Sequence, residues 1–152
     1  MNQHKENTKI KWKEPFDVYN LVAHLDSRGF LIELLRFKDQ DIPGKGQLYT
    51  FSIEPGIRRG DHYHLRKREW FTCVYGEVIV LLSKGKGKTC VVHISPKEPK
   101  IVYVGPHTAH ALINNTDTTA VIVSYGSEQH NPEDEDTYKH IAYKNYQDFN
   151  LK

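Results

Sequence analysis

The sequence predicts an all-β protein, a β-sandwich or β-barrel built as a single domain. Short apolar segments rich in Val, Ile, Tyr and Thr, the residues that strands favour, recur along the chain. Turn-forming residues such as Gly, Pro and Asn separate these segments. No helical period of apolar residues is sustained before about Asp134. Many short strands at close spacing are typical of sandwiches and barrels.

The elements follow in order from a polar, lysine-bearing start. Residues 1–14 are expected to form a flexible N-terminal arm, ahead of one domain over residues 15–152. The expected strands cover residues 16–25, 30–37, 47–53, 70–75, 77–82, 90–94, 101–104, 109–113 and 120–125. Gly76 lies between two apolar runs and is expected to let the chain bend sharply there. Residues 137–149 fit either a short helix or a last strand.

Composition excludes several classes of protein. The 152 residues carry 21 basic and 19 acidic side chains, so nucleic acid is not an expected partner. The two cysteines, Cys73 and Cys90, form neither a disulfide framework nor a C-x-x-C metal motif. No apolar stretch resembles a membrane helix or a signal-peptide core, so a cytoplasmic protein with no membrane partner is expected. Because no G-x-G-x-x-G sequence occurs, no nicotinamide cofactor is expected.

Two clusters of histidines are candidates for a functional site. His62 and His64 are two residues apart, which on a strand places both imidazoles on one face. Residues 65–68 are expected to form a polar hairpin loop, after which Glu69 opens the next strand opposite the histidines. His110, in the second cluster, completes a set of three histidines and one carboxylate if its strand folds over the same cavity. Such ligands suit a divalent metal (zinc, nickel, iron or manganese) with positions left open for substrate.

The spacing of these residues resembles the two signature motifs of the cupin superfamily. The first motif is Gly56, five residues, His62-x-His64, four residues, Glu69, six residues and a last glycine. The second motif ends in a histidine and, four positions later, an asparagine, which His110 and Asn114 match. Gly105 and His107 replace the usual proline and glycine of that motif. The resemblance implies a cupin-type jelly roll.

Residues around the motifs narrow the resemblance to cupins that act on nucleotide sugars. The stretch from Asp26 to Glu33 is similar to the D-x-R-G-x-x-x-E opening of deoxyrhamnose 3,5-epimerases. The run Arg59-Gly-Asp-His-Tyr-His-Leu-Arg-Lys-Arg-Glu-Trp-Phe most resembles the C-terminal cupin domain of capsular-polysaccharide epimerase–reductases. An acidic tail ending in Asp136-Thr137-Tyr138 is also similar to that domain, and the reductase half is missing. The likeness spans roughly residues 16–140.

The resemblance implies a function in surface-polysaccharide (capsule or O-antigen) biosynthesis. The expected substrate is a nucleotide-activated 4-keto-6-deoxy sugar, and the expected reaction is epimerisation at C3. A ketone at C4 acidifies the neighbouring C–H bonds, so a base, an acid and a group that holds the oxyanion are needed. A 3,4-ketoisomerase without metal and a non-catalytic sugar-binding cupin are the alternatives.

Roles for individual residues follow from the same resemblance. His62 and His64 either hold a metal with Glu69 and His110 or transfer protons directly, because a metal-bound nitrogen is no longer a free base. The further catalytic candidates are Lys67 and Tyr138. The substrate-binding candidates are Arg59, whose planar guanidinium suits a phosphate or an oxyanion, and Tyr63 and His107. A homodimer is expected, since an open sandwich leaves edge strands to be covered, and residues 19–22 and the arm could be exchanged.

Overall fold

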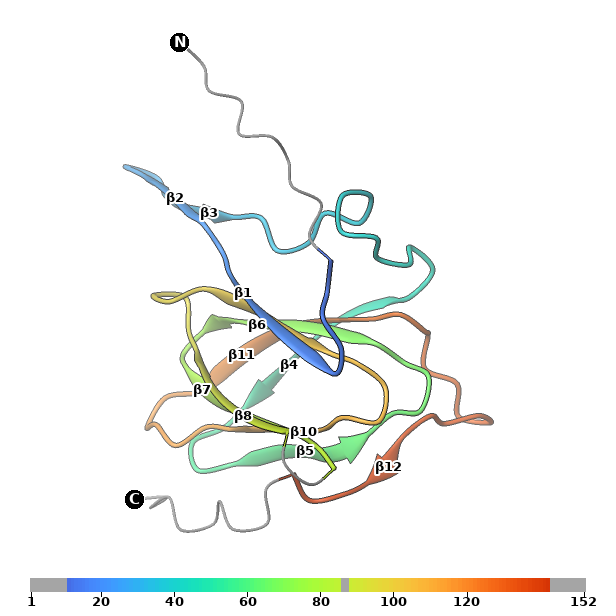
Figure 1. Ribbon diagram of the computed structural model, residues 1–152. Helices are drawn as coiled ribbons and strands as arrows, with labels where there is room; N and C mark the ends of the chain where they lie inside the picture. The colour runs from blue at the N-terminus through green and yellow to red at the C-terminus, as the bar shows by residue number, and fades with distance from the viewer. Residues whose placement is uncertain (1–10, 86–87, 143–152) are drawn as a thin grey trace.

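The structure, a computed structural model, describes residues 11–85 and 88–142 as an all-β domain (Figure 1). Two five-stranded antiparallel sheets pack face to face, and a separate two-stranded hairpin projects from them. The strands are β1 (Phe16–Asn20), β2 (Ala23–Asp26), β3 (Gly29–Ile32), β4 (Gln47–Ile53), β5 (Arg58–Tyr63), β6 (Glu69–Tyr75), β7 (Val78–Lys84), β8 (Lys88–Ile94), β9 (Lys100–Val104), β10 (Ala109–Ile113), β11 (Ala120–Gly126) and β12 (Tyr138–Lys139). Within the described ranges, no helix is long and apolar enough to cross a membrane.

The chain passes repeatedly from one sheet to the other. The first sheet has the order β1-β9-β6-β11-β4, and the second has the order β12-β5-β10-β7-β8. From β4 onward, successive strands therefore change sheets, except that β7 and β8 form a hairpin. This arrangement is a jelly roll, so the expected fold class is confirmed. Gly76 has a φ of 71°, and it makes one of the sharp turns between sheets.

The main core lies between the two sheets. It contains residues from most strands of the two sheets, including Phe71 on β6, Val80 and Leu82 on β7, and Leu112 on β10. The intervening residues of β6 also are buried, because Trp70 packs on the other face of the first sheet with Tyr103 and Trp12. Burial on both faces explains why β6 reads as a continuous apolar run rather than as an alternating one.

Several element boundaries differ from the sequence prediction. The segment expected at residues 16–25 divides into β1 and β2, and the segment at residues 30–37 ends as a strand at Ile32. Strand β5 was not among the expected segments, because its Arg, Gly and Asp residues lack an apolar pattern. The prediction of a hairpin over residues 65–68 is wrong: β5 and β6 belong to different sheets, so this loop crosses the sandwich. Residues 1–10 of the expected arm and 143–149 of the expected last element lie outside the described residues.

Candidate functional site

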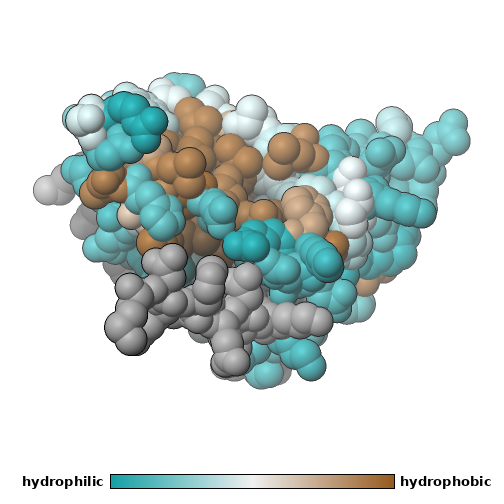
Figure 2. Space-filling model, turned by 90° about the horizontal axis from the view of Figure 1, so that it is seen from above, coloured by the Kyte–Doolittle hydropathy of each residue, from teal (hydrophilic) through white to brown (hydrophobic). Residues whose placement is uncertain are grey.

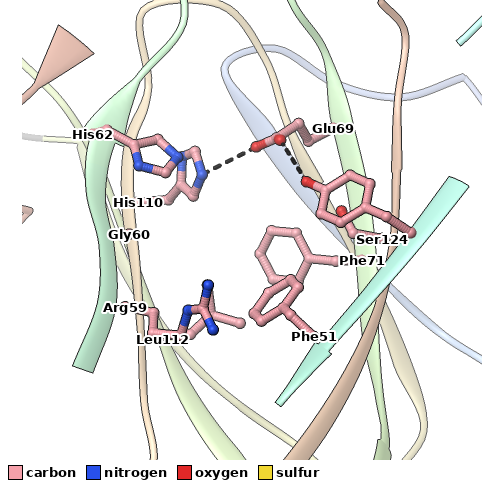
Figure 3. Close-up of a pocket in the computed structure, with 10 residues that line it drawn as sticks. Phe51, Arg59, Gly60, His62, Glu69, Phe71, His110, Leu112 and Ser124 are labelled. Carbon is pink, nitrogen blue, oxygen red and sulfur yellow. Dashed lines mark hydrogen bonds and ion pairs between the residues drawn. The ribbon is translucent and has the colours of Figure 1, made fainter. Parts of the chain in front are cut away.

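Both sheets contribute to a cluster of three histidines and one carboxylate. His62 lies on β5, directly opposite His110 on the paired strand β10. His64 follows the end of β5, and Glu69 is the first residue of β6 in the other sheet. One ligand atom from each of the four side chains lies within 4.8 Å of the others. The structure thus brings together all four residues that the motif spacing selected. Figure 3 shows three of them, His62, Glu69 and His110.

Glu69 is the centre of this cluster. Its Oε2 lies 3.2 Å from His64 Nε2 and 3.0 Å from His110 Nε2. Its Oε1 accepts a hydrogen bond of 3.0 Å from the Tyr49 hydroxyl on β4. The carboxylate is almost completely buried. Although burial alone would raise the pKa of Glu69, the two histidines outweigh it and hold that pKa well below its usual value.

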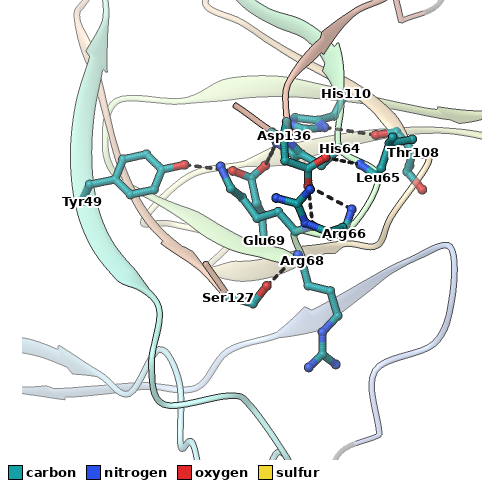
Figure 4. Close-up of polar contacts among 11 residues, drawn as sticks. Tyr49, His64, Leu65, Arg66, Arg68, Glu69, Thr108, His110, Ser127 and Asp136 are labelled. Atoms are coloured by element: carbon teal, nitrogen blue, oxygen red, sulfur yellow. Dashed lines mark hydrogen bonds and ion pairs between the residues drawn. The ribbon is translucent and has the colours of Figure 1, made fainter. Parts of the chain in front are cut away.

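Backbone carbonyls fix the orientation of two histidine rings (Figure 4). His64 Nδ1 contacts the Asp136 carbonyl, and His110 Nδ1 lies 3.2 Å from the Thr108 carbonyl. Since a carbonyl only accepts, both Nδ1 atoms must carry the proton. Each Nε2 is then turned toward Glu69. This is the arrangement by which proteins orient metal-binding histidines, with the outer nitrogen bonded to an acceptor.

The donor set fits a divalent metal ion. His64 Nε2 is buried and has no hydrogen-bond partner with acceptable geometry, although it lies 3.2 Å from Glu69 Oε2. A buried nitrogen without a partner is costly unless it binds something else. Three imidazole nitrogens and one carboxylate oxygen suit zinc, nickel, iron or manganese.

Burial and neighbouring charges shift the pKa values of the residues around His62 in different directions. Burial, followed by the neighbouring His110, lowers the pKa of His62 to about 4, so this ring is neutral at pH 7. Burial also acts to lower the pKa of His64, but the Glu69 carboxylate more than offsets it and the pKa is raised. Burial and the charge of Glu69 raise the pKa of the Tyr49 hydroxyl, which therefore keeps its proton. The site combines a neutral imidazole with an ionised carboxylate.

The cluster opens into a pocket of about 230 Å³ between the sheets. Its lining is Tyr49, Phe51, Arg59, Gly60, His62, Glu69, Phe71, His110, Leu112 and Ser124. Arg59 is held in place in two ways: its guanidinium lies 5.0 Å from the centre of the Phe51 ring, and it donates a 3.1 Å hydrogen bond to the Ser52 carbonyl. The pocket therefore has an apolar wall, a cation and the histidine–carboxylate cluster.

A β-bulge in β5 allows Arg59 and His62 to share this pocket. Residues three apart on a regular strand point to opposite faces. Here His110 pairs with His62 while Ala111 pairs with Gly60, so Asp61 is the extra residue of a bulge. Asp61 has a φ of 57° and Gly60 a φ of 96°. A Cβ on Gly60 would lie 2.7 Å from the His110 carbonyl oxygen, so glycine is needed for β5 to approach β10.

The structure does not bring the remaining predicted residues to the pocket lining. Tyr63 packs against the apolar cluster on the other face of its sheet, because it alternates with His62. Tyr138 on β12 stacks on Tyr63, with ring centres 5.4 Å apart. His107 is exposed and has a φ of 61°, which explains why the motif usually has glycine there. Lys67 lies in the loop between sheets, and its charge contributes to lowering the pKa of His62.

Sequence reasoning missed several residues of the site. Tyr49 and Ser124 line the pocket, and Asp136 contacts His64 from the C-terminal segment. The expected strand at residues 47–53 contained the signal for Tyr49, because Tyr49 and Phe51 are two apart and share a face. The tail ending in Asp136-Thr137-Tyr138 contributed to the family resemblance, but no role at the site was predicted for Asp136.

The fold and the site together define a cupin-type domain with a three-histidine, one-carboxylate cluster. Residues 24–138 match the family model described as the polysaccharide biosynthesis C-terminal domain. The chain belongs to this family, which confirms the resemblance drawn from the motifs.

Known proteins of this kind are similar over most of the chain. The spore coat polysaccharide biosynthesis protein SpsL of Bacillus subtilis is 28% identical over 125 residues, which are 78% of this chain and 83% of SpsL. The capsular polysaccharide assembling protein CapF of Staphylococcus aureus is 26% identical, with a TM-score of 0.61. That match covers 81% of this chain and 35% of CapF. A dTDP sugar isomerase of Desulfovibrio desulfuricans, 16% identical, shares the fold with a TM-score of 0.77 over 91% of both chains.

Proposed function

We propose that this protein is an epimerase that inverts C3 of a nucleotide-activated 4-keto-6-deoxy sugar during surface-polysaccharide biosynthesis. Membership of a polysaccharide-biosynthesis family supports the pathway class. The observation that carries the proposal is the pocket, where a buried histidine–carboxylate cluster and a fixed arginine face one cavity. The cluster is suited to bind the ketone and to act on the proton next to it, and Arg59 is suited to bind the anionic diphosphate.

The proposed chemistry is proton removal beside the ketone. The C4 carbonyl acidifies the C3–H bond, and loss of this proton gives an enediolate-like anion. Return of a proton to the opposite face of C3 completes the inversion. Arg59 is placed to contact the diphosphate or the oxyanion, and its planar guanidinium suits either group. Tyr49, whose hydroxyl lines the pocket and keeps its proton, is the proposed acid that delivers a proton to the opposite face of C3. Lys67 lies outside the lining, in the loop between the sheets, and is the proposed base that reaches in as a neutral amine and takes the C3 proton.

His62, His64, Glu69 and His110 would hold the metal ion in this proposal. A divalent ion there would polarise the sugar ketone as a Lewis acid. The chain itself supplies the imidazole nitrogens, an ionised carboxylate and a pocket with an apolar wall. The carbonyl contacts of His64 and His110 orient the rings before any ion binds.

A second candidate function, a 3,4-ketoisomerase without metal, is favoured by one observation. Among the described residues, the ion pairs of Glu69 involve His64 and His110 but not His62. A neutral, unpaired His62 in the pocket could accept the C3 proton itself. The proton would then be delivered to the C4 carbon, while the proton of the C3 hydroxyl passes to the oxygen on C4, so that the ketone moves to C3.

The test is NMR of nucleotide-4-keto-6-deoxyhexoses mixed with the protein in deuterated water. We expect deuterium at C3 and a product with inverted C3. A 3-keto product would establish the ketoisomerase instead, and exchange at C5 alone would indicate a rhamnose-type epimerase. If neither carbon exchanges with several nucleotides tested, the protein is a sugar-binding cupin.

We also propose that the protein is a homodimer. The β2–β3 hairpin pairs only with itself among the described strands. It carries three exposed apolar side chains, Leu25, Phe30 and Leu31, which are 78%, 60% and 59% exposed, and Val22 just before it is 68% exposed. Figure 2 shows apolar side chains gathered on one face of the molecule, seen from above Figure 1. Contiguous apolar surface of this kind marks an interface more often than a free surface.

A further inference from the structure

We propose that Asp136 is a positioning residue that holds His64 and the loop between the sheets in the geometry that metal binding needs. The inference rests on the proposed function for its metal, but its contacts are all within this chain. The segment from residue 127 to residue 142, named here the C-terminal strap, carries Asp136 and follows β11. Asp136 is 4% exposed and does not line the pocket, so it acts through its neighbours.

The carboxylate of Asp136 binds the loop that crosses from β5 to β6. Its Oδ1 accepts a hydrogen bond from the Leu65 N–H at 2.8 Å. Its Oδ2 accepts bonds from the N–H groups of Arg66 at 2.9 Å and Lys67 at 2.8 Å. Three successive backbone donors that converge on one carboxylate form an anion-binding nest (Figure 4). This loop separates His64 from Glu69, so its shape sets where the two ligands lie relative to each other.

The backbone of the same residue fixes the His64 ring. The Asp136 carbonyl accepts the hydrogen bond from His64 Nδ1. The bond selects the tautomer that leaves Nε2 free to face Glu69. Asp136 therefore acts at two points of one ligand: its side chain shapes the loop after His64, and its carbonyl orients the imidazole. Partners of this kind are as much a part of a metal site as the ligands.

The rest of the strap keeps Asp136 in place along β5. Strand β12 pairs with β5, with Tyr138 opposite Tyr63 and Lys139 opposite His62. Further along, the His140 N–H donates to the Asp61 carbonyl at 2.8 Å, and the Ala142 N–H donates to the Asp61 carboxylate at 3.0 Å. The strap thus pairs with one edge of β5 while β10 pairs with the other. The strand that carries His62 is supported on both sides.

The test compares Asp136→Asn with Asp134→Asn in the full chain. The Asp134→Asn change removes the same charge from the same strap, but among the described residues the Asp134 side chain pairs only with the Arg66 guanidinium, at 3.1 Å. Cobalt(II) is titrated into metal-free protein, and its d–d absorption reports the affinity. We expect the D136N variant to bind cobalt about 10–100-fold more weakly, the usual effect of losing a partner of a metal ligand. We expect D134N to stay within about twofold of the original protein, as for a surface change.

A second readout needs no metal. The His64 Nδ1–H proton, followed by nitrogen-15 NMR in the metal-free protein, should be protected from exchange in the original protein and in D134N. In D136N the signal of this proton should be broadened or should disappear through exchange with water. If D136N does not fold by circular dichroism, Asp136→Glu, which keeps the carboxylate, is measured in the same two ways, and an intermediate effect is expected.

The outcomes separate this inference from the proposed function. Unchanged cobalt affinity together with a protected His64 proton in a folded D136N variant would overturn the inference. A lower melting temperature with unchanged affinity would also overturn it, because Asp136 would then serve stability alone. If the original protein binds no cobalt, the proposed metal centre is ruled out. The exchange of the His64 proton still decides whether Asp136 positions His64.

Discussion

The histidine–carboxylate site and the β2–β3 hairpin differ in the burial and the contacts of their side chains. At the site, His64, Glu69 and His110 are nearly fully buried, and each contacts polar groups from other strands or loops. On the β2–β3 hairpin, by contrast, apolar side chains such as Leu25 and Phe30 are mostly exposed and have only each other as cross-strand neighbours. All four members of the histidine–carboxylate cluster therefore come from one chain, whereas the exposed side chains of the hairpin have few neighbours among the described residues.

This difference indicates separate roles for the two regions. Buried charged groups are tolerated only when they are paired or bind a ligand, so the site end is built for chemistry. The exposed apolar side chains of the projecting hairpin are the basis of the dimer that we propose. Substitutions at the site should thus change exchange and metal binding, and substitutions on the hairpin should change assembly.

The largest effect is expected for His62→Ala. Because His62 faces the pocket as either metal ligand or base, its loss should reduce deuterium exchange at C3 by about 10²–10⁴-fold. The control is His93→Ala, which removes an exposed histidine on β8. Exchange is measured by NMR at equal protein concentration. A His62→Ala variant as active as the original protein would mean that the chemistry lies elsewhere.

Tyr49→Phe should have the next largest effect. It removes the pocket hydroxyl that donates to Glu69 and is proposed to carry a proton. We expect exchange to fall by about 10²-fold, the lower limit for loss of a general acid or base, with cobalt still bound. Tyr75→Phe, at a residue that is 62% exposed, serves as the control. Equal rates for both variants would remove Tyr49 from the mechanism.

Gly60→Ala tests the bulge that turns Arg59 toward the pocket. The new Cβ would lie 2.7 Å from the His110 carbonyl oxygen at a φ of 96°. We expect the free energy of unfolding to fall by about 1–3 kcal/mol, the range for backbone strain of this kind. Gly44→Ala is the matched control, because nothing lies within 4 Å of a Cβ there. Urea unfolding curves would contradict the prediction if the two variants have equal midpoints.

The smallest effect on stability, with the largest on assembly, is expected for the double substitution Leu25→Ser and Phe30→Ser. Both side chains are exposed, so the free energy of unfolding of the monomer should change by less than about 0.5 kcal/mol. Sedimentation should show a shift from dimer to monomer at micromolar concentration. A monomeric original protein, with a mass near 17.7 kDa, would rule out the dimer before any substitution is made.

The sequence predicts the site better than it predicts the path of the chain. Local spacing is enough for His62, His64 and Glu69, because strand alternation and a short loop bring them to one cavity. The bulge at Asp61 is not predictable, since Arg59 and His62 share a face only through the register with β10. The length of the loop at residues 65–68 likewise does not indicate whether it closes a hairpin or crosses from one sheet to the other. Asp136 lies 72 residues from His64 in the sequence, so only the folded chain reveals their contact.

The central claim is that side chains from two sheets form one metal centre. The most direct test is elemental analysis of protein purified without chelator and compared with His64→Ala and His93→Ala. We predict about one first-row divalent ion per chain in the original protein and in His93→Ala, and sharply less in His64→Ala. No stoichiometric metal in the original protein would contradict the claim and leave the histidines as direct proton-transfer groups.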